Sequence, residues 1–121
     1  MTAFDDLREI VPLKIWDGVI GRAVAGEEAT LAALELAPGT VVPEHQHANE
    51  QIGILLRGSV TFRIGDERKA LGPGATWVIP ANVPHDVEAG PEGAWLIELF
   101  APPRSDWGGL ERLEPSAPPG F

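Results

Sequence analysis

The sequence of 121 residues contains no cysteine and has half as many basic as acidic side chains. Without cysteine, the chain can form no disulfide and offers no thiolate to a metal ion. Its 9 lysine and arginine residues stand against 18 aspartate and glutamate residues, giving a formal net charge of −9. Because the basic residues form no cluster, we expect no binding to nucleic acid or to anionic membranes.

Long apolar stretches are also missing. No run approaches the roughly 20 apolar residues that a membrane-spanning helix needs. The first ten residues include Asp5, Asp6, Arg8 and Glu9 and lack the apolar core of a signal peptide. We therefore expect a cytoplasmic protein with no membrane contact.

Glycine and proline, in contrast, are abundant, with 14 and 12 residues. They lie between short apolar runs, which predicts many turns between short strands. Apolar runs at 19–24 and 29–36 precede strand-like segments at 51–57, 60–64, 68–71, 76–79, 85–88 and 94–101. We expect turns at residues 58–59 and 90–93. This spacing predicts an all-β fold, an antiparallel sandwich or barrel of eight or more strands.

The length indicates a single domain covering residues 1–121. Its core is expected at about residues 12–107. An N-terminal arm, 1–11, is either irregular or a short helix from Thr2 to Ile10, and a proline-rich tail follows at 108–121. Segments 52–56 and 95–100 are apolar on both faces, and a chain this short has few elements to cover their outer faces. We therefore expect a homodimer.

The three histidines of the sequence have a spacing that can build one site. His45 and His47 are two residues apart, so their side chains share a face of an extended chain, and Gln51 has the same parity. Glu50 has the opposite parity. With His85 from another strand, they suit a site of three imidazoles with an open position. The alternative is that His45 and His47 form an ordinary surface pair.

Two segments resemble the motifs of the cupin family. Residues 39–58 are similar to G-x5-H-x-H-x3-E-x6-G, with Gln51 in the place of the glutamate. Residues 74–89 are similar to G-x5-P-x-G-x2-H-x3-N, with Asn82 and Ala89 in the places of the second glycine and the asparagine. Independently of the motif, Asn82 suits the turn between two prolines.

This resemblance implies a cupin β-jelly-roll, an antiparallel double-sheet barrel, that binds one divalent metal ion. The implied ligands are His45, His47, Gln51 and His85. A neutral amide in the place of a carboxylate leaves the metal with more positive charge, so it favours an anionic ligand and disfavours the usual oxygenase chemistry. Alternatively, Gln51 only faces the pocket, and Glu50 or water completes the shell. Zn, Ni, Mn and Fe all suit these donors.

A narrower resemblance links segments 49–52, 79–85 and 99–107 to the pectin-degradation cupins, which linearise 4,5-unsaturated uronates. That family has an aspartate and a phenylalanine before its P-P-R stretch, where this chain has Glu98 and Phe100. The resemblance implies that both residues line the substrate pocket. The change from aspartate to glutamate lengthens the acid by one methylene, which bears on the choice of substrate.

The residues themselves support a role for Glu98 and Arg104. Glu98 lies in an apolar strand, where burial would raise its pKa into a range useful for acid–base catalysis; alternatively, it is solvated or paired with an arginine at a sheet edge. Arg104 can bind a substrate carboxylate through two hydrogen bonds, or form a surface salt bridge. Trp77 and Trp95 are expected in the core.

The leading hypothesis is a metal-dependent enzyme acting on a small, anionic sugar acid or related carbonyl compound. Glu98 would move protons, Phe100 would line the pocket and Arg104 would hold the substrate. A dioxygenase or polyketide cyclase on the same scaffold is a second reading. A third is a sensory or ligand-binding protein without catalysis, because one fold serves many functions.

Overall fold

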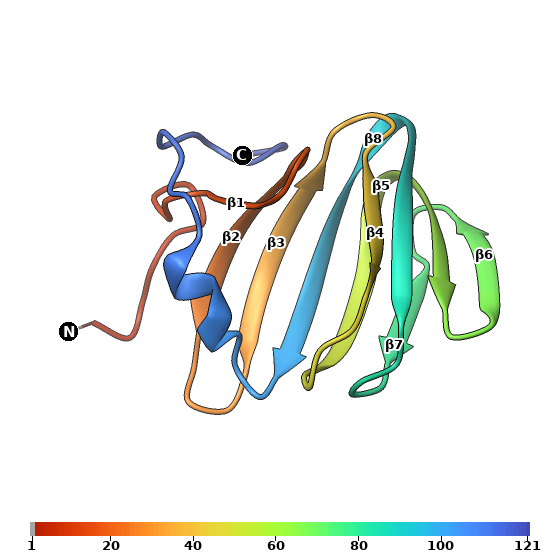
Figure 1. Cartoon of the computed structure of the whole chain (residues 1–121). Coiled ribbons are helices and arrows are strands. Elements are labelled where there is room, and N and C mark those ends of the chain that lie inside the picture. Colours follow the sequence, from red (N-terminus) through yellow and green to blue (C-terminus); the bar gives the residue numbers. More distant parts are fainter. Residues whose placement is uncertain (1) are drawn as a thin grey trace.

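The computed structural model describes residues 2–121, and almost all of its regular structure is β-strand (Figure 1). The strands are β1 (Leu13–Trp16), β2 (Val19–Ala25), β3 (Thr30–Leu36), β4 (Val41–His45), β5 (Glu50–Ile64), β6 (Glu67–Leu71), β7 (Thr76–Ile79) and β8 (His85–Ala101). A short 3-10 helix, η1 (Ser105–Gly109), follows β8. The all-β prediction is confirmed. Within residues 2–121, no helix is long and apolar enough to cross a membrane.

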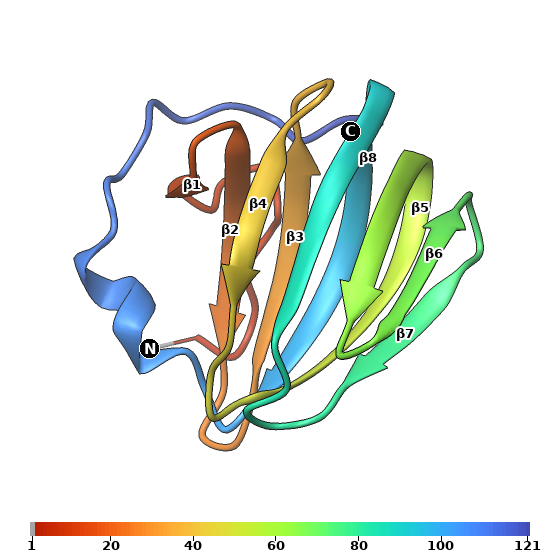
Figure 2. The same cartoon turned by 45° about the vertical axis from the view of Figure 1, so that its right-hand side comes forward.

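The two long strands, β5 and β8, join the layers of the molecule. The strand order is β1-β2-β3-β8-β5-β6, with β4 paired to β8 and β7 paired to β5, and every pairing is antiparallel. The second half of β8 lies between β3 and β5, whereas its first half lies between β4 and β5. Figure 2 shows the strands curving around a common interior, as in a jelly roll.

The turns predicted at 58–59 and 90–93 are wrong, because β5 and β8 continue through both positions. Gly58 and Gly93 have φ angles of 81° and 77°, which bend the chain without ending the strand. A Cβ on Gly58 would lie 2.0 Å from the carbonyl oxygen of Gly93. Gly58 and Gly93 therefore allow β5 and β8 to approach closely at the point where both strands bend.

The segments outside the barrel are irregular. The N-terminal arm contains turns but no helix among residues 2–12, in agreement with one of the two expectations. The tail is anchored by the buried side chain of Arg22, whose Nη2 donates to the carbonyl and hydroxyl oxygens of Ser116, both at 2.9 Å. It passes across β1 towards the sheet (Figure 1).

A close contact between β5 and β7 fixes the position of a core tryptophan. Gly53 is the register partner of Trp77, and a Cβ on Gly53 would lie 2.4 Å from the indole ring. Trp77 itself is buried and packs against Phe62, with ring centroids 4.9 Å apart. Only glycine at position 53 leaves the indole in this place.

Gly53→Ala is expected to destabilise the protein by about 1–3 kcal/mol, because the indole of Trp77 must move in a close-packed core. Urea denaturation measures the change. Gly72→Ala is the matched control, since a Cβ there would meet no atom within 4 Å. Equal stabilities of the two variants would show that the contact is not restrictive.

Candidate metal centre

The three histidines come together inside one end of the barrel. His45 ends β4, His47 lies in the loop that follows, and His85 begins β8 as the register partner of His45. Their candidate ligand atoms all lie within 4.8 Å of one another. The cluster predicted from spacing is therefore present, and three histidines this close together can bind a metal ion.

Each imidazole is oriented by a backbone carbonyl. Nδ1 of His45 lies 2.8 Å from the oxygen of Pro43, and Nδ1 of His85 lies 2.9 Å from that of Val83. His47 makes the same contact with the oxygen of Asn49, at 2.9 Å. Because a carbonyl can only accept, each Nδ1 carries the hydrogen and each Nε2 presents a lone pair.

These Nε2 atoms suit a metal ion. Nε2 of His85 is buried and has no hydrogen-bond partner among residues 2–121, a costly state for a polar atom unless a ligand satisfies it. Burial lowers the pKa of His85 to about 4. The pKa of His47 is also lowered, first by burial and then by the charge of Arg104. Both imidazoles are neutral near neutral pH, as metal ligands must be.

Gln51 is buried beside this cluster, whereas Glu50 is exposed. Nε2 of the Gln51 amide donates to Oε2 of Glu98, which directs Oε1 towards His47, 3.0 Å from its Nε2. An amide oxygen and an imidazole lone pair are both acceptors, so they fit together best around a shared cation. Gln51 thus lies beside the histidines as expected, although the loop at residues 46–49, and not one extended strand, separates it from His45.

Glu98 lies behind Gln51 and is held by two donors. Its Oε2 accepts from Gln51 and from Nε1 of Trp77, the latter at 2.9 Å. Glu98 is 5 % exposed, so the alternative of a solvated edge residue is excluded. Burial raises the pKa of Glu98, although the hydrogen bonds from Gln51 and Trp77 oppose the shift. No hydrogen bond from residues 2–121 reaches Oε1.

A cavity of about 180 Å³ joins the candidate site residues. Its wall includes His45, His85, Gln51, Glu98, Phe100 and Arg104. Phe100 is buried, with its ring 5.9 Å from that of His47. The guanidinium of Arg104 lies over the ring of Phe100, 4.9 Å from the centroid. A small molecule in this cavity would contact imidazole, carboxylate, aromatic and guanidinium groups together.

Several residues of the site were not expected from the sequence. Trp77 was predicted in the core, and it is buried there, but it also donates to Glu98. Asp106 binds Arg104, and Trp16 lies 5.3 Å from His45 between ring centroids. The glycine at position 53 is a sequence signal for the position of Trp77, because only a residue without a Cβ leaves room for the indole. Asp106 falls in segment 99–107, which resembles the pectin-degradation cupins, but no role was expected for it, and no local pattern distinguished Trp16.

Asn82 occupies the turn expected for it. Its φ of 64° is in the left-handed region, which asparagine tolerates better than most residues other than glycine. Its backbone N–H donates to the carbonyl oxygen of His47 at 2.7 Å. This conformation explains how asparagine can stand where the second motif has glycine.

The fold and the histidine cluster define a β-jelly-roll with a candidate metal centre inside the barrel. Residues 32–97, more than half of the chain, match the cupin domain model, and the chain belongs to the cupin family. The predicted cupin fold is therefore confirmed.

Named relatives include proteins of pectin degradation. The chain is 26% identical over 96 residues to the pectin degradation protein KdgF of Dickeya dadantii, covering 78% of this chain and 87% of that protein. The structure of KdgF from a Halomonas species matches with a TM-score of 0.79 and 24% identity, covering 88% of this chain and 98% of that one. An RmlC-like cupin from Shewanella frigidimarina matches with a TM-score of 0.80 and 21% identity, covering 88% and 96%. The resemblance to pectin-degradation cupins is thus supported.

Proposed function

We propose that the protein is a metal-dependent enzyme that opens and tautomerises a 4,5-unsaturated uronate. The observation that carries the proposal is the buried carboxylate of Glu98 in a cavity that His45, His85 and Arg104 also line. Similarity to the pectin degradation protein KdgF supports the same substrate class.

The reaction is an isomerisation that needs no oxidant. Ring opening removes the proton of the anomeric hydroxyl and breaks the bond between C1 and the ring oxygen. The resulting enolate takes up one proton at C4 and becomes a ketone, so one proton is removed, one is added and the overall composition does not change. An enzyme that catalyses these two steps must bind the acid, polarise one of its oxygens and move a proton.

The residues of the cavity are suited to these tasks. His45, His47, His85 and Gln51 would hold the metal ion, which when bound supplies a Lewis acid for a substrate oxygen. Arg104 would bind the substrate carboxylate. Glu98 would accept and return the proton at Oε1, because both of its donors are on Oε2. Phe100 would exclude water from this wall.

The test is turnover of unsaturated galacturonate by the purified, metal-loaded protein, followed as loss of the absorbance of the conjugated C=C bond. The same reaction is monitored with an oxygen electrode. Loss of absorbance without oxygen uptake supports the isomerase. Substrate-dependent oxygen uptake would indicate that the protein is a dioxygenase instead.

We also infer that the protein is a homodimer joined through an outer sheet face. Ile52 pairs with both Val78 and Leu99, so apolar side chains continue across β7, β5 and β8. Exposed fractions on this face are 41% for Ile52 and 55% for Val78. The face also includes Ile54 and Leu56, and a contiguous apolar surface of this kind is typical of an interface.

Light scattering is expected to give twice the 12.9 kDa mass of the chain. Ile52→Glu should convert the dimer to monomer, because it places a charge at the centre of the apolar face. Val41→Glu is the control, since Val41 is 59% exposed on β4, away from this face. A wild-type protein of monomer mass would refute the interface.

A further inference from the structure

Arg104 is fixed in the cavity wall by aromatic stacking. Its guanidinium lies over Phe100 and over Trp107, 4.9 and 4.7 Å from the ring centroids. Its side chain is only 13% exposed, and its backbone N–H donates to Oγ1 of Thr30 at 3.0 Å. The position of the guanidinium therefore does not depend on any one ionic partner.

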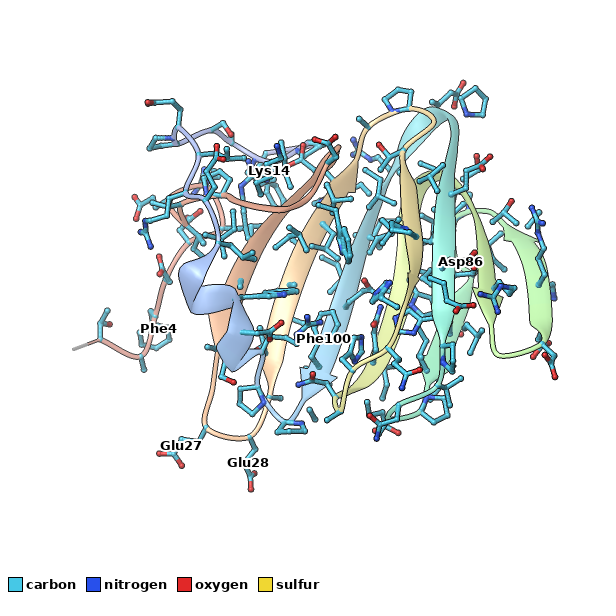
Figure 3. All side chains as sticks on the ribbon, in the orientation of Figure 1. Phe4, Lys14, Glu27, Glu28, Asp86 and Phe100 are labelled. Carbon is cyan, nitrogen blue, oxygen red and sulfur yellow. The ribbon has the colours of Figure 1, made fainter. Side chains whose placement is uncertain are left out.

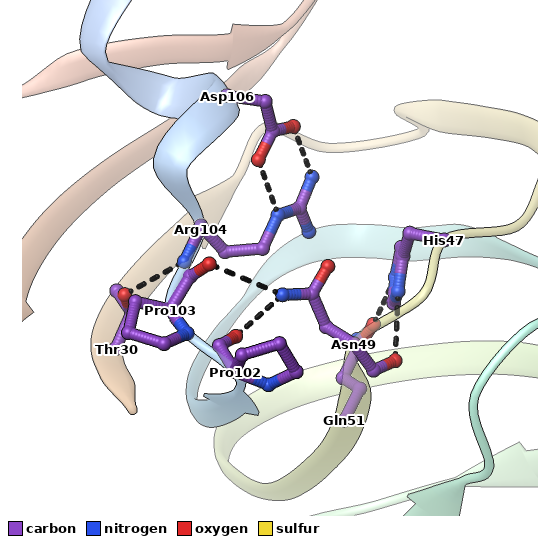
Figure 4. A network of polar contacts seen from close by, with 8 residues as sticks. All are labelled: Thr30, His47, Asn49, Gln51, Pro102, Pro103, Arg104 and Asp106. Carbon is purple, nitrogen blue, oxygen red and sulfur yellow. Dashed lines mark hydrogen bonds and ion pairs between the residues drawn. The ribbon is translucent and has the colours of Figure 1, made fainter. Parts of the chain in front are cut away.

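A carboxylate of the protein itself already accepts hydrogen bonds from this guanidinium. Nε and Nη2 of Arg104 donate to Oδ1 and Oδ2 of Asp106, at 3.0 and 2.8 Å (Figure 4). This is the paired geometry that an arginine uses to bind a free carboxylate. Asp106 lines the same cavity, yet its side chain is 63% exposed on η1.

We propose that Asp106 is a built-in competitor for the substrate carboxylate and sets the affinity of the site for sugar acids. The proposal rests on the anionic substrate of the proposed function. An incoming acid takes the Nε and Nη2 hydrogens, and the exposed Asp106 side chain turns to solvent. Phe100 and Trp107 keep the guanidinium in place during this exchange.

The exchange has a physical consequence for selectivity. One charge-assisted pair replaces another, so Arg104 contributes little net affinity to a ligand that offers only a carboxylate. A ligand gains affinity when it also reaches the groups deeper in the cavity. The same exchange lets Asp106 displace the carboxylate of the product. Asp106 is thus a specificity-determining residue that acts through Arg104.

Calorimetric titration of the Zn²⁺-loaded protein with galacturonate, and with galactose as the neutral analogue, tests this. Asp106→Asn should bind galacturonate about 3–10-fold more tightly than wild type, from the worth of a partly exposed ion pair, and galactose unchanged. Arg104→Gln should remove the small preference for the acid that the exchange leaves in the wild type. Glu28→Gln removes a charge from a loop that points away from the barrel (Figure 3) and should change neither affinity.

Unchanged or weaker galacturonate binding by Asp106→Asn would overturn the proposal, since Asp106 would then only support Arg104. A gain that is equal for galactose and galacturonate would also overturn it. The binding assay does not depend on turnover. If Asp106→Asn tightens binding of the acid but no variant turns over unsaturated galacturonate, the proposed reaction fails and the competitor role stands. If the protein turns over unsaturated galacturonate but Asp106→Asn binds galacturonate with the affinity of the wild type, only the competitor role is rejected.

Discussion

Glu98→Gln is expected to lower turnover by about 10²–10⁴-fold while the protein keeps its metal, the usual contribution of a positioned acid–base group. Glutamine has nearly the same shape, and its amide oxygen can still accept from Gln51 and Trp77. It cannot carry the transferred proton. Because Glu98 is buried beside the candidate ligands rather than among them, metal content should not change.

Glu98→Asp provides the rescue for this experiment. It keeps the carboxylate and introduces the residue of the pectin-degradation cupins at this place, so part of the activity should remain. Metal content is measured by mass spectrometry on each variant. Full turnover in Glu98→Gln would show that another group moves the proton. Loss of metal from that variant would mean that Glu98 belongs to the ligand shell.

His47→Ala and His85→Ala are each expected to reduce metal affinity by at least about 100-fold, since loss of even an outer-shell partner costs 10–100-fold. Each removes a neutral Nε2 donor from a cluster whose ligand atoms lie within 4.8 Å. Dialysis against a metal buffer followed by mass spectrometry measures the metal that remains. Turnover should fall with it.

Asp86→Asn is the matched control for these variants. Asp86 follows His85 directly, but its carboxylate accepts from Nε of Arg63 at 2.8 Å instead of facing the cluster. The labelled Asp86 side chain lies on the far side of the barrel from η1 (Figure 3). The Asp86→Asn variant should retain its metal. A histidine variant that still binds one equivalent would contradict the proposed centre.

Two members of the histidine cluster were predictable from a local signal. His45 and His47 share a face of an extended chain by their spacing alone, and the same rule distinguished Gln51 from Glu50. His85 needed a long-range pairing, which the motif order supplied. The structure places it as the register partner of His45.

The wrong turn predictions and the missed contact of Trp77 share a long-range origin. Residues 58–59 and 90–93 have the composition of turns, yet β5 and β8 pair with each other on either side of both positions, with a register shift between Gly58 and Val60. Pairing over this distance leaves no local pattern. The contact of Trp77 with Glu98 likewise depends on β7 and β8 both neighbouring β5. Homodimerisation and the catalytic roles stay predictions.

The most direct test of the account is turnover of unsaturated galacturonate by one preparation before metal removal, after it and after reconstitution. A chelator is used to remove the metal, and Zn, Ni, Mn or Fe is then added back singly. We expect loss of the C=C absorbance with the loaded protein, no loss beyond the uncatalysed rate after metal removal, and recovery with at least one metal. Equal rates in the stripped and loaded states, or no turnover in any state, would contradict it.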